Sequence, residues 1–142
     1  MVQVIRATII VSGLLWLCVA AAQDPQFTAR LSTVPIDPRT QAMVTGVGTA
    51  SAMLSGRELS ITGSFEGLQG PANLAQLHLG PITGARGPAI LDLAVSNAAE
   101  GSLSGTVELT RQQAAALREG RIYIQIHSES APEGNLWGWL LQ

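Results

Sequence analysis

Residues 121–128 read Arg-Ile-Tyr-Ile-Gln-Ile-His-Ser, with three isoleucines alternating with tyrosine, glutamine and histidine. Successive side chains of a β-strand point to opposite faces, so this pattern predicts a strand with one aliphatic and one polar face. The isoleucine face is expected to point into a core. Tyr123 lies on the other face, and we expect it to contribute less to stability than Ile124.

The same alternation recurs along the chain and predicts about eight short strands. They are expected over residues 27–33, 44–54, 59–66, 74–79, 89–95, 102–109, 121–127 and 136–141. Segments rich in Gly, Pro, Asn and Asp separate them, including residues 131–135 before the last strand. The sequence therefore predicts an all-β fold, either an antiparallel sandwich or a Greek-key barrel. The expected buried set is Leu59, Ile61, Phe65, Leu77, Leu91, Leu93, Val107, Leu109, Ile122, Ile124, Ile126 and Leu140.

One segment departs from the period of two. Thr110 and Gln113 have the spacing of a capping box, and three alanines and Leu117 follow. Gly120 can end a helix in a left-handed conformation. We expect one short helix over residues 110–119, held by Leu117 packing on the sheet.

The first 22 residues have the pattern of a secretory signal peptide. Arg6 precedes an uncharged run over residues 7–22, which ends in three alanines. We expect cleavage after Ala22, which leaves a mature domain of residues 23–142 in the periplasm or outside the cell. An uncleaved membrane anchor and a lipoprotein lipidated at Cys18 are the alternatives.

Charge and cysteine content exclude several classes of protein. All eight basic residues are arginines, and they stand against ten acidic residues. No basic cluster is present, so we expect no nucleic-acid binding. After cleavage we expect no membrane span. The single cysteine lies within the expected leader, so the mature chain can form neither a disulfide framework nor a thiolate zinc site.

The two histidines, His78 and His127, are the most informative polar residues. Each lies near a strand end and shares a strand face with the glutamine two residues earlier, Gln76 or Gln125. Both rings could simply hydrogen-bond to backbone at the base of a loop. Alternatively, they could bind a divalent metal such as copper or zinc if their strands are neighbours. A third ligand would then come from Asp92, Glu129 or Glu133.

Trp137 and Trp139 alternate with smaller or aliphatic residues, so both rings lie on one face of the last strand. An exposed aromatic pair can bind sugars or a partner protein. The other interpretation is that a loop or neighbouring side chains cover the rings. Together with Gln76 and Gln125, the pair forms a candidate binding surface.

Three blocks in order resemble the CHRD domain, a repeat named from chordin. They are Ala-Gln-Leu-His-Leu-Gly-Pro at 75–81 with Gly-Pro at 87–88, Gly-Thr-Val-Glu-Leu-Thr at 105–110, and Ile-Tyr-Ile-Gln-Ile-His-Ser at 122–128 with Pro-Glu-Gly-Asn-Leu-Trp-Gly-Trp-Leu at 132–140. The resemblance implies an all-β extracytoplasmic module. Gln76 stands where the family usually has a further histidine, and Trp137 stands where it usually has arginine.

These observations leave two hypotheses for function. The first is a non-enzymatic binding or interaction module whose partner is an unidentified extracytoplasmic protein or ligand. The alternative is a weak divalent-metal-binding protein that uses His78 and His127. The mature sequence has no cysteine nucleophile and no Gly-x-Ser-x-Gly motif, so we expect no enzymatic activity of those types.

Overall fold

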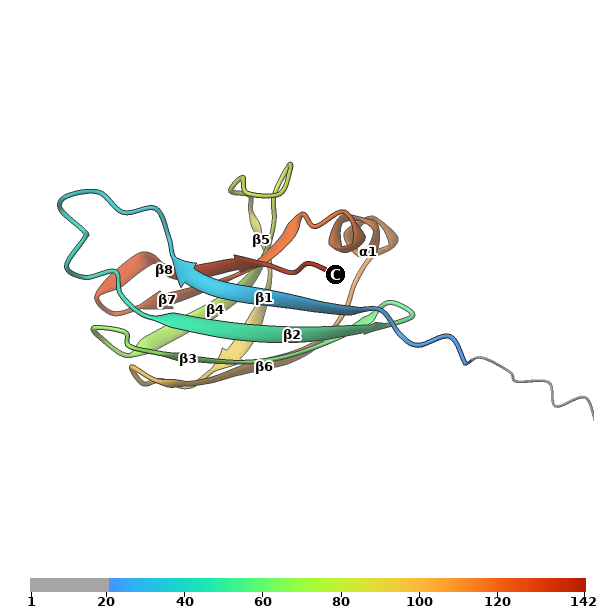
Figure 1. The fold of residues 1–142 in the computed structure, drawn as a ribbon, viewed down its shortest axis with the longest axis horizontal. Helices are drawn as coiled ribbons and strands as arrows, with labels where there is room; N and C mark the ends of the chain where they lie inside the picture. The colour runs from blue at the N-terminus through green and yellow to red at the C-terminus, as the bar shows by residue number, and fades with distance from the viewer. Residues whose placement is uncertain (1–20) are drawn as a thin grey trace, which may run out of the picture.

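A computed structural model describes residues 21–142. Residues 1–20 of the expected leader, with Cys18 of the alternative lipoprotein interpretation, lie outside the described residues. Within them the chain forms eight strands and one helix (Figure 1). The elements are β1 (Gln26–Thr33), β2 (Val47–Ser55), β3 (Glu58–Glu66), β4 (Ala72–Leu79), β5 (Ala89–Val95), β6 (Gly101–Glu108), α1 (Arg111–Arg118), β7 (Ile122–Ser128) and β8 (Ala131–Trp139). No helix among the described residues is long and apolar enough to cross a membrane.

The strands close into a barrel in the order β1-β2-β3-β6-β5-β4-β7-β8, and all pairings are antiparallel. Strands β4, β5 and β6 are consecutive neighbours, and β3 lies beside β6, which is a Greek-key arrangement. The predicted all-β class is thus confirmed. The closed barrel decides between the two architectures, because β1 pairs with both β2 and β8.

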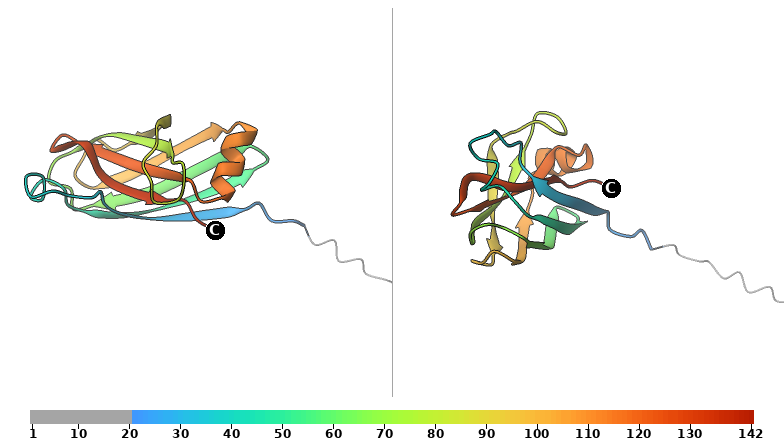
Figure 2. Two further views of the ribbon diagram at one scale, coloured as in Figure 1. Left: turned by 90° about the horizontal axis from the view of Figure 1, so that it is seen from above. Right: turned by 60° about the vertical axis from the view of Figure 1, so that its left-hand side comes forward.

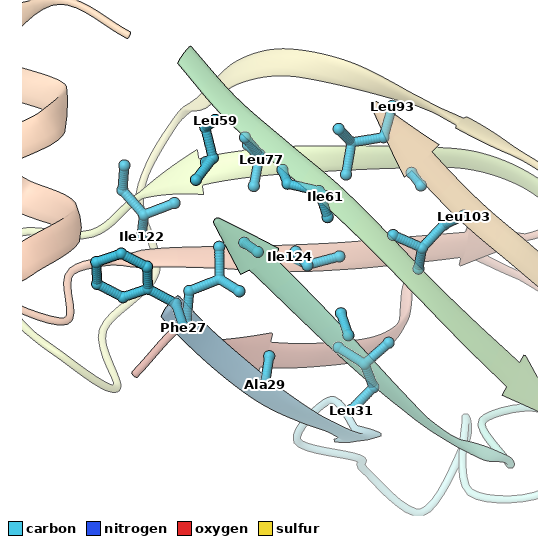
Figure 3. Packing of buried hydrophobic residues seen from close by; sticks show 14 of the residues in the cluster. Phe27, Ala29, Leu31, Leu59, Ile61, Leu77, Leu93, Leu103, Ile122 and Ile124 are labelled. Atoms are coloured by element: carbon cyan, nitrogen blue, oxygen red, sulfur yellow. The ribbon is translucent and has the colours of Figure 1, made fainter. Parts of the chain in front are cut away.

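Aliphatic side chains from the inner faces of the strands fill the barrel (Figure 3). Ile122, Ile124 and Ile126 of β7 are completely buried, as the alternation predicts. In the expected core only Leu91 and Val107 are half-buried rather than buried. Strands β5 and β6 pair over only two residues of each strand. The rest of each strand has no neighbouring strand on that side, and this part includes Leu91 and Val107.

Helix α1 lies at one end of the barrel (Figure 2). The predicted capping box is present, because Thr110 Oγ1 accepts from the Gln113 amide and the Gln113 side chain accepts from the Thr110 amide. Leu117 is completely buried against the core cluster. Gly120 adopts φ 70°, so the helix ends where the sequence predicts.

Two strand boundaries differ from the prediction by three residues or more. Strand β2 begins at Val47 rather than residue 44, because Gly46 has φ 108° and interrupts the extended chain. The expected turn over residues 131–135 is wrong, since β8 already begins at Ala131 and the turn is confined to residues 129–130. Ser128 Oγ accepts from the Ala131 amide at 3.1 Å and tightens this hairpin.

The core position of Ile124 predicts a large loss of stability when its side chain is shortened. Ile124→Ala removes buried methylene groups and leaves a cavity, so we expect the free energy of unfolding to fall by about 2–5 kcal/mol. Ile82 is 65% exposed in the β4–β5 connection, so Ile82→Ala is the matched control and should change little. Chemical denaturation of both variants measures the difference. Equal losses would contradict the assignment of the inner face of β7.

Candidate functional site

The candidate site lies on the outer face of β4, β7 and β8. Strand β7 lies between the other two, so the polar faces that the sequence predicts on separate strands form one surface. Gln76 pairs with Gln125, which in turn pairs with Trp137. One row away, His78 pairs with Tyr123, which pairs with Trp139. The closed topology thus brings all six predicted site residues to one surface.

His78 and His127 reach toward each other across the row formed by Gln76 and Gln125. His78 pairs with Tyr123 on one side of that row, and His127 pairs with Leu74 on the other. The two imidazole ring centroids are 6.5 Å apart, with an interplanar angle of 30°. The strands that carry the histidines are therefore neighbours, as the metal-binding hypothesis requires.

A backbone carbonyl fixes the orientation of each imidazole. His78 Nδ1 lies 2.9 Å from the Gly87 carbonyl oxygen, and His127 Nδ1 lies 2.9 Å from the Pro132 carbonyl oxygen. A carbonyl oxygen only accepts hydrogen bonds, so each Nδ1 carries the proton and donates it. In the neutral ring, Nε2 then carries a free lone pair. The predicted hydrogen bonds to backbone are present, and they leave the other nitrogen of each ring available.

Both Nε2 atoms are buried and have no hydrogen-bond partner among residues 21–142. Buried nitrogen atoms in proteins are usually satisfied by a hydrogen bond, so each unpaired atom needs an explanation. Here the two atoms belong to neighbouring rings whose centroids are 6.5 Å apart. Among the described residues only one other buried side-chain nitrogen or oxygen lacks a partner, Trp139 Nε1.

The electrostatic environment favours neutral His78. Burial lowers the pKa of His78 from its ordinary value of 6.5. The hydrogen bond to Gly87 raises this pKa, whereas the nearby charges of His127 and Arg86 lower it. The net effect keeps His78 unprotonated near neutral pH, and only an unprotonated imidazole can bind a metal.

Tyr123 is a site residue that the sequence did not identify. The prediction that it contributes less to stability than Ile124 rested on an outward-facing position, and here that outer face is covered. The side chain is only 1% exposed. Its ring lies 4.9 Å from the His78 ring and 4.9 Å from the Trp139 ring, measured between centroids. The hydroxyl lies 3.1 Å from the Gly87 amide nitrogen and 3.2 Å from the Gly87 carbonyl oxygen.

The β4–β5 connection, residues 80–88, covers this part of the outer face. Gly87 approaches so closely that an added Cβ would collide with the Leu79 carbonyl oxygen. From this position Gly87 contacts both His78 and Tyr123 through hydrogen bonds. The glycine and its preceding loop were visible in the sequence, but their contact with Tyr123 depends on the pairing of β4 with β7.

The two tryptophans are half-buried. They are therefore neither fully exposed nor fully covered, which were the two interpretations of the sequence. Trp137 and Trp139 meet edge to face, with ring centroids 4.7 Å apart. The Arg86 guanidinium carbon lies 5.1 Å from the centroid of the Trp137 ring. The indole Nε1 of Trp139 is buried and unpaired within the described chain.

The predicted third metal ligands do not join the histidines. In the part of the chain that the structure describes, no group of three His, Cys, Asp or Glu side chains is positioned to hold an ion. The carboxylate of Asp92 instead accepts from the Gln76 amide at 2.7 Å. Gln125 is buried, and its amide donates to the Glu133 carbonyl oxygen at 3.1 Å. Neither Asp92, Glu129 nor Glu133 therefore completes a three-ligand set.

Comparison with known proteins gives one match. The family model described as the CHRD domain matches residues 27–140, which is nearly the whole described chain. No curated protein and no solved structure matches the chain.

The lowered pKa of His78 predicts that acid weakens the fold. Below pH 6.5 the unfolded chain binds a proton at this histidine more readily than the folded chain does. The free energy of unfolding should therefore decrease as the pH falls from 6.5 toward the lower pKa of the folded state. His78→Asn keeps an amide donor near Gly87 but cannot titrate, so its stability should depend less on pH.

Denaturant unfolding of the metal-free wild type and His78→Asn at several pH values measures this effect. The other acidic and basic groups are present in both proteins, so the difference between the two pH profiles reports the effect of His78. Parallel profiles would show that His78 does not titrate differently in the folded state.

Proposed function

Because the chain belongs to the CHRD domain family, we propose that it is a non-enzymatic binding module that holds a metal ion between His78 and His127. The observation that carries the proposal is the pair of buried Nε2 atoms that have no hydrogen-bond partner within residues 21–142. A lone pair buried without a partner costs free energy, and an ion bound by both nitrogens would remove that cost at two positions.

The hydrogen bonds of the opposite nitrogens support the same proposal. Metal-binding histidines almost always donate their second ring nitrogen to a carbonyl, a carboxylate or water, which fixes the ring and its tautomer. His78 and His127 each make this bond, to Gly87 and Pro132. The rings are thus prepared to present Nε2 as a ligand without a change of protonation.

The distance between the rings also supports a shared ion. A ring nitrogen lies roughly 1.1 Å from the imidazole centroid and a metal–nitrogen bond is about 2.0–2.1 Å, so two rings on one ion have centroids up to about 6.3 Å apart. The observed 6.5 Å exceeds this by a few tenths of an ångström. A shared ion therefore requires the rings to approach by a few tenths of an ångström with both Nε2 atoms turned toward it. Imidazole suits copper and zinc, which are the expected metals.

The proposed place of action is outside the cytoplasm, either in the periplasm or in the medium. The order of basic, apolar and small residues over positions 1–22 supports export. Mass spectrometry of the exported protein should then find an N-terminus at Gln23. A mature protein that retains Met1 would contradict this.

The half-buried tryptophans support a second candidate, an interaction surface for a protein or a sugar. Trp137 and Trp139 leave part of their rings accessible, although Arg86 packs over Trp137. Tryptophan and arginine are the residues that most often anchor an interface. This candidate requires no metal, so Trp137→Ala separates the two proposals.

Calorimetric titration of the exported protein with Zn²⁺ and with Cu²⁺ tests the metal proposal. We expect one ion per chain, removable by a chelator, and binding that fades below about pH 6.5 as protons compete for the imidazoles. His78→Asn and His127→Asn should each reduce affinity at least tenfold, because each removes one of two ligands. Trp137→Ala should bind as the wild type does. Unchanged binding in both histidine variants would refute the site.

A further inference from the structure

We propose that the ion held between His78 and His127 is monovalent copper, Cu(I), in preference to Zn²⁺ or Cu²⁺. This inference rests on the proposed function and specifies its ligand. Three properties of the site carry it: the charge of the donor set, the separation of the rings and the burial of both nitrogens. Each distinguishes a monovalent ion with two ligands from a divalent ion with four.

The donor set carries no negative charge. Both ligands are neutral imidazoles, and within residues 21–142 no third acidic or histidine side chain joins them. The positive charge of Arg86 acts on His78 and opposes a cation. Desolvation of an ion costs free energy in proportion to the square of its charge, so an uncompensated divalent ion costs roughly four times as much as a monovalent one.

The ring separation favours a wide angle at the metal. Two imidazoles that meet at a tetrahedral angle on one ion have centroids about 5.1 Å apart, whereas a linear arrangement places them about 6.3 Å apart. The observed 6.5 Å lies slightly beyond the linear value and well beyond the tetrahedral one, so a linear arrangement requires the smaller approach of the rings. Zn²⁺ requires four tetrahedral ligands and Cu²⁺ prefers a tetragonal set, whereas filled-shell Cu(I) is stable with two nitrogens in line.

Burial removes the remaining ligands that a divalent ion would need. Neither Nε2 atom is accessible to water in the structure. A zinc or Cu²⁺ ion at this position would have to complete its coordination with water molecules. Cu(I) needs none, so the enclosed site suits it.

Gln76 determines this preference. It lies on the row between the two histidines, but its amide donates to Asp92 at 2.7 Å and is thereby held toward β5. An amide is also a poorer ligand than imidazole for copper and zinc. A histidine at position 76 would start from the same face and could supply a third nitrogen. We therefore expect Gln76→His to favour divalent ions.

The test is an anaerobic competition of the exported protein against a chromophoric chelator of Cu(I), with Ag⁺ as a monovalent ion that does not change oxidation state. Parallel titrations use Zn²⁺ and Cu²⁺. We expect the protein to bind one Cu(I) or one Ag⁺ per chain, and to bind Cu(I) at least 100-fold more tightly than Zn²⁺. His78→Asn and His127→Asn should each abolish the binding of Cu(I) and of Ag⁺. Gln76→His should raise Zn²⁺ affinity at least tenfold and leave Cu(I) affinity nearly unchanged.

The outcomes separate this inference from the proposed function. If Zn²⁺ or Cu²⁺ binds as tightly as Cu(I) and still requires both histidines, the preference for Cu(I) is wrong and the metal site stands. If no metal binds, or binding ignores both histidine substitutions, the proposed function fails as well. X-ray absorption of the Cu(I) form should show two nitrogen neighbours, and a count of four would also overturn the inference.

Discussion

Two backbone carbonyls determine what the outer face of this barrel can do. The oxygens of Gly87 and Pro132 each accept the Nδ1 proton of a histidine, His78 or His127. Because a carbonyl cannot donate, the proton of each neutral ring stays on Nδ1 and the lone pair stays on Nε2. The metal-binding role proposed for His78 and His127 depends on this choice of tautomer.

The barrel supplies the rigidity that this arrangement needs. Strands β4 and β7 pair along nearly their full length, and completely buried isoleucines anchor β7 to the core. The covering loop is fixed in turn by Tyr123, whose hydroxyl contacts both the amide and the carbonyl of Gly87. A buried tyrosine thus links the core strand, the loop and the His78 ring.

The sequence predicted local structure well because the alternation of apolar and polar residues shows which face of a strand is buried. The isoleucine alternation of β7 and the capping box at Thr110 need no distant partner to be recognised. The early start of β8 at Ala131 was missed because its turn-like residues are extended by pairing with β7. The choice of a closed barrel was equally hidden, since it depends on β1 pairing with the distant β8.

The candidate site was predicted as a set of residues but not as a geometry. His78, His127, Gln76 and the tryptophans were identified from shared strand faces. Their distances depend on which strands are neighbours, which alternation does not encode. The burial of Tyr123 was missed for a related reason, because the residues that cover it come from a loop and from β8.

The tautomer of the two histidines tests the account most directly, and it can be read without any metal. Long-range proton–nitrogen correlation spectra of the metal-free protein, labelled with ¹⁵N at histidine, distinguish a protonated ring nitrogen from a bare one. At about pH 7.5, roughly one unit above the ordinary histidine pKa, both rings should carry the proton on Nδ1 and none on Nε2. A proton on Nε2 of either His78 or His127 would contradict the account, because that nitrogen would then have no lone pair to offer.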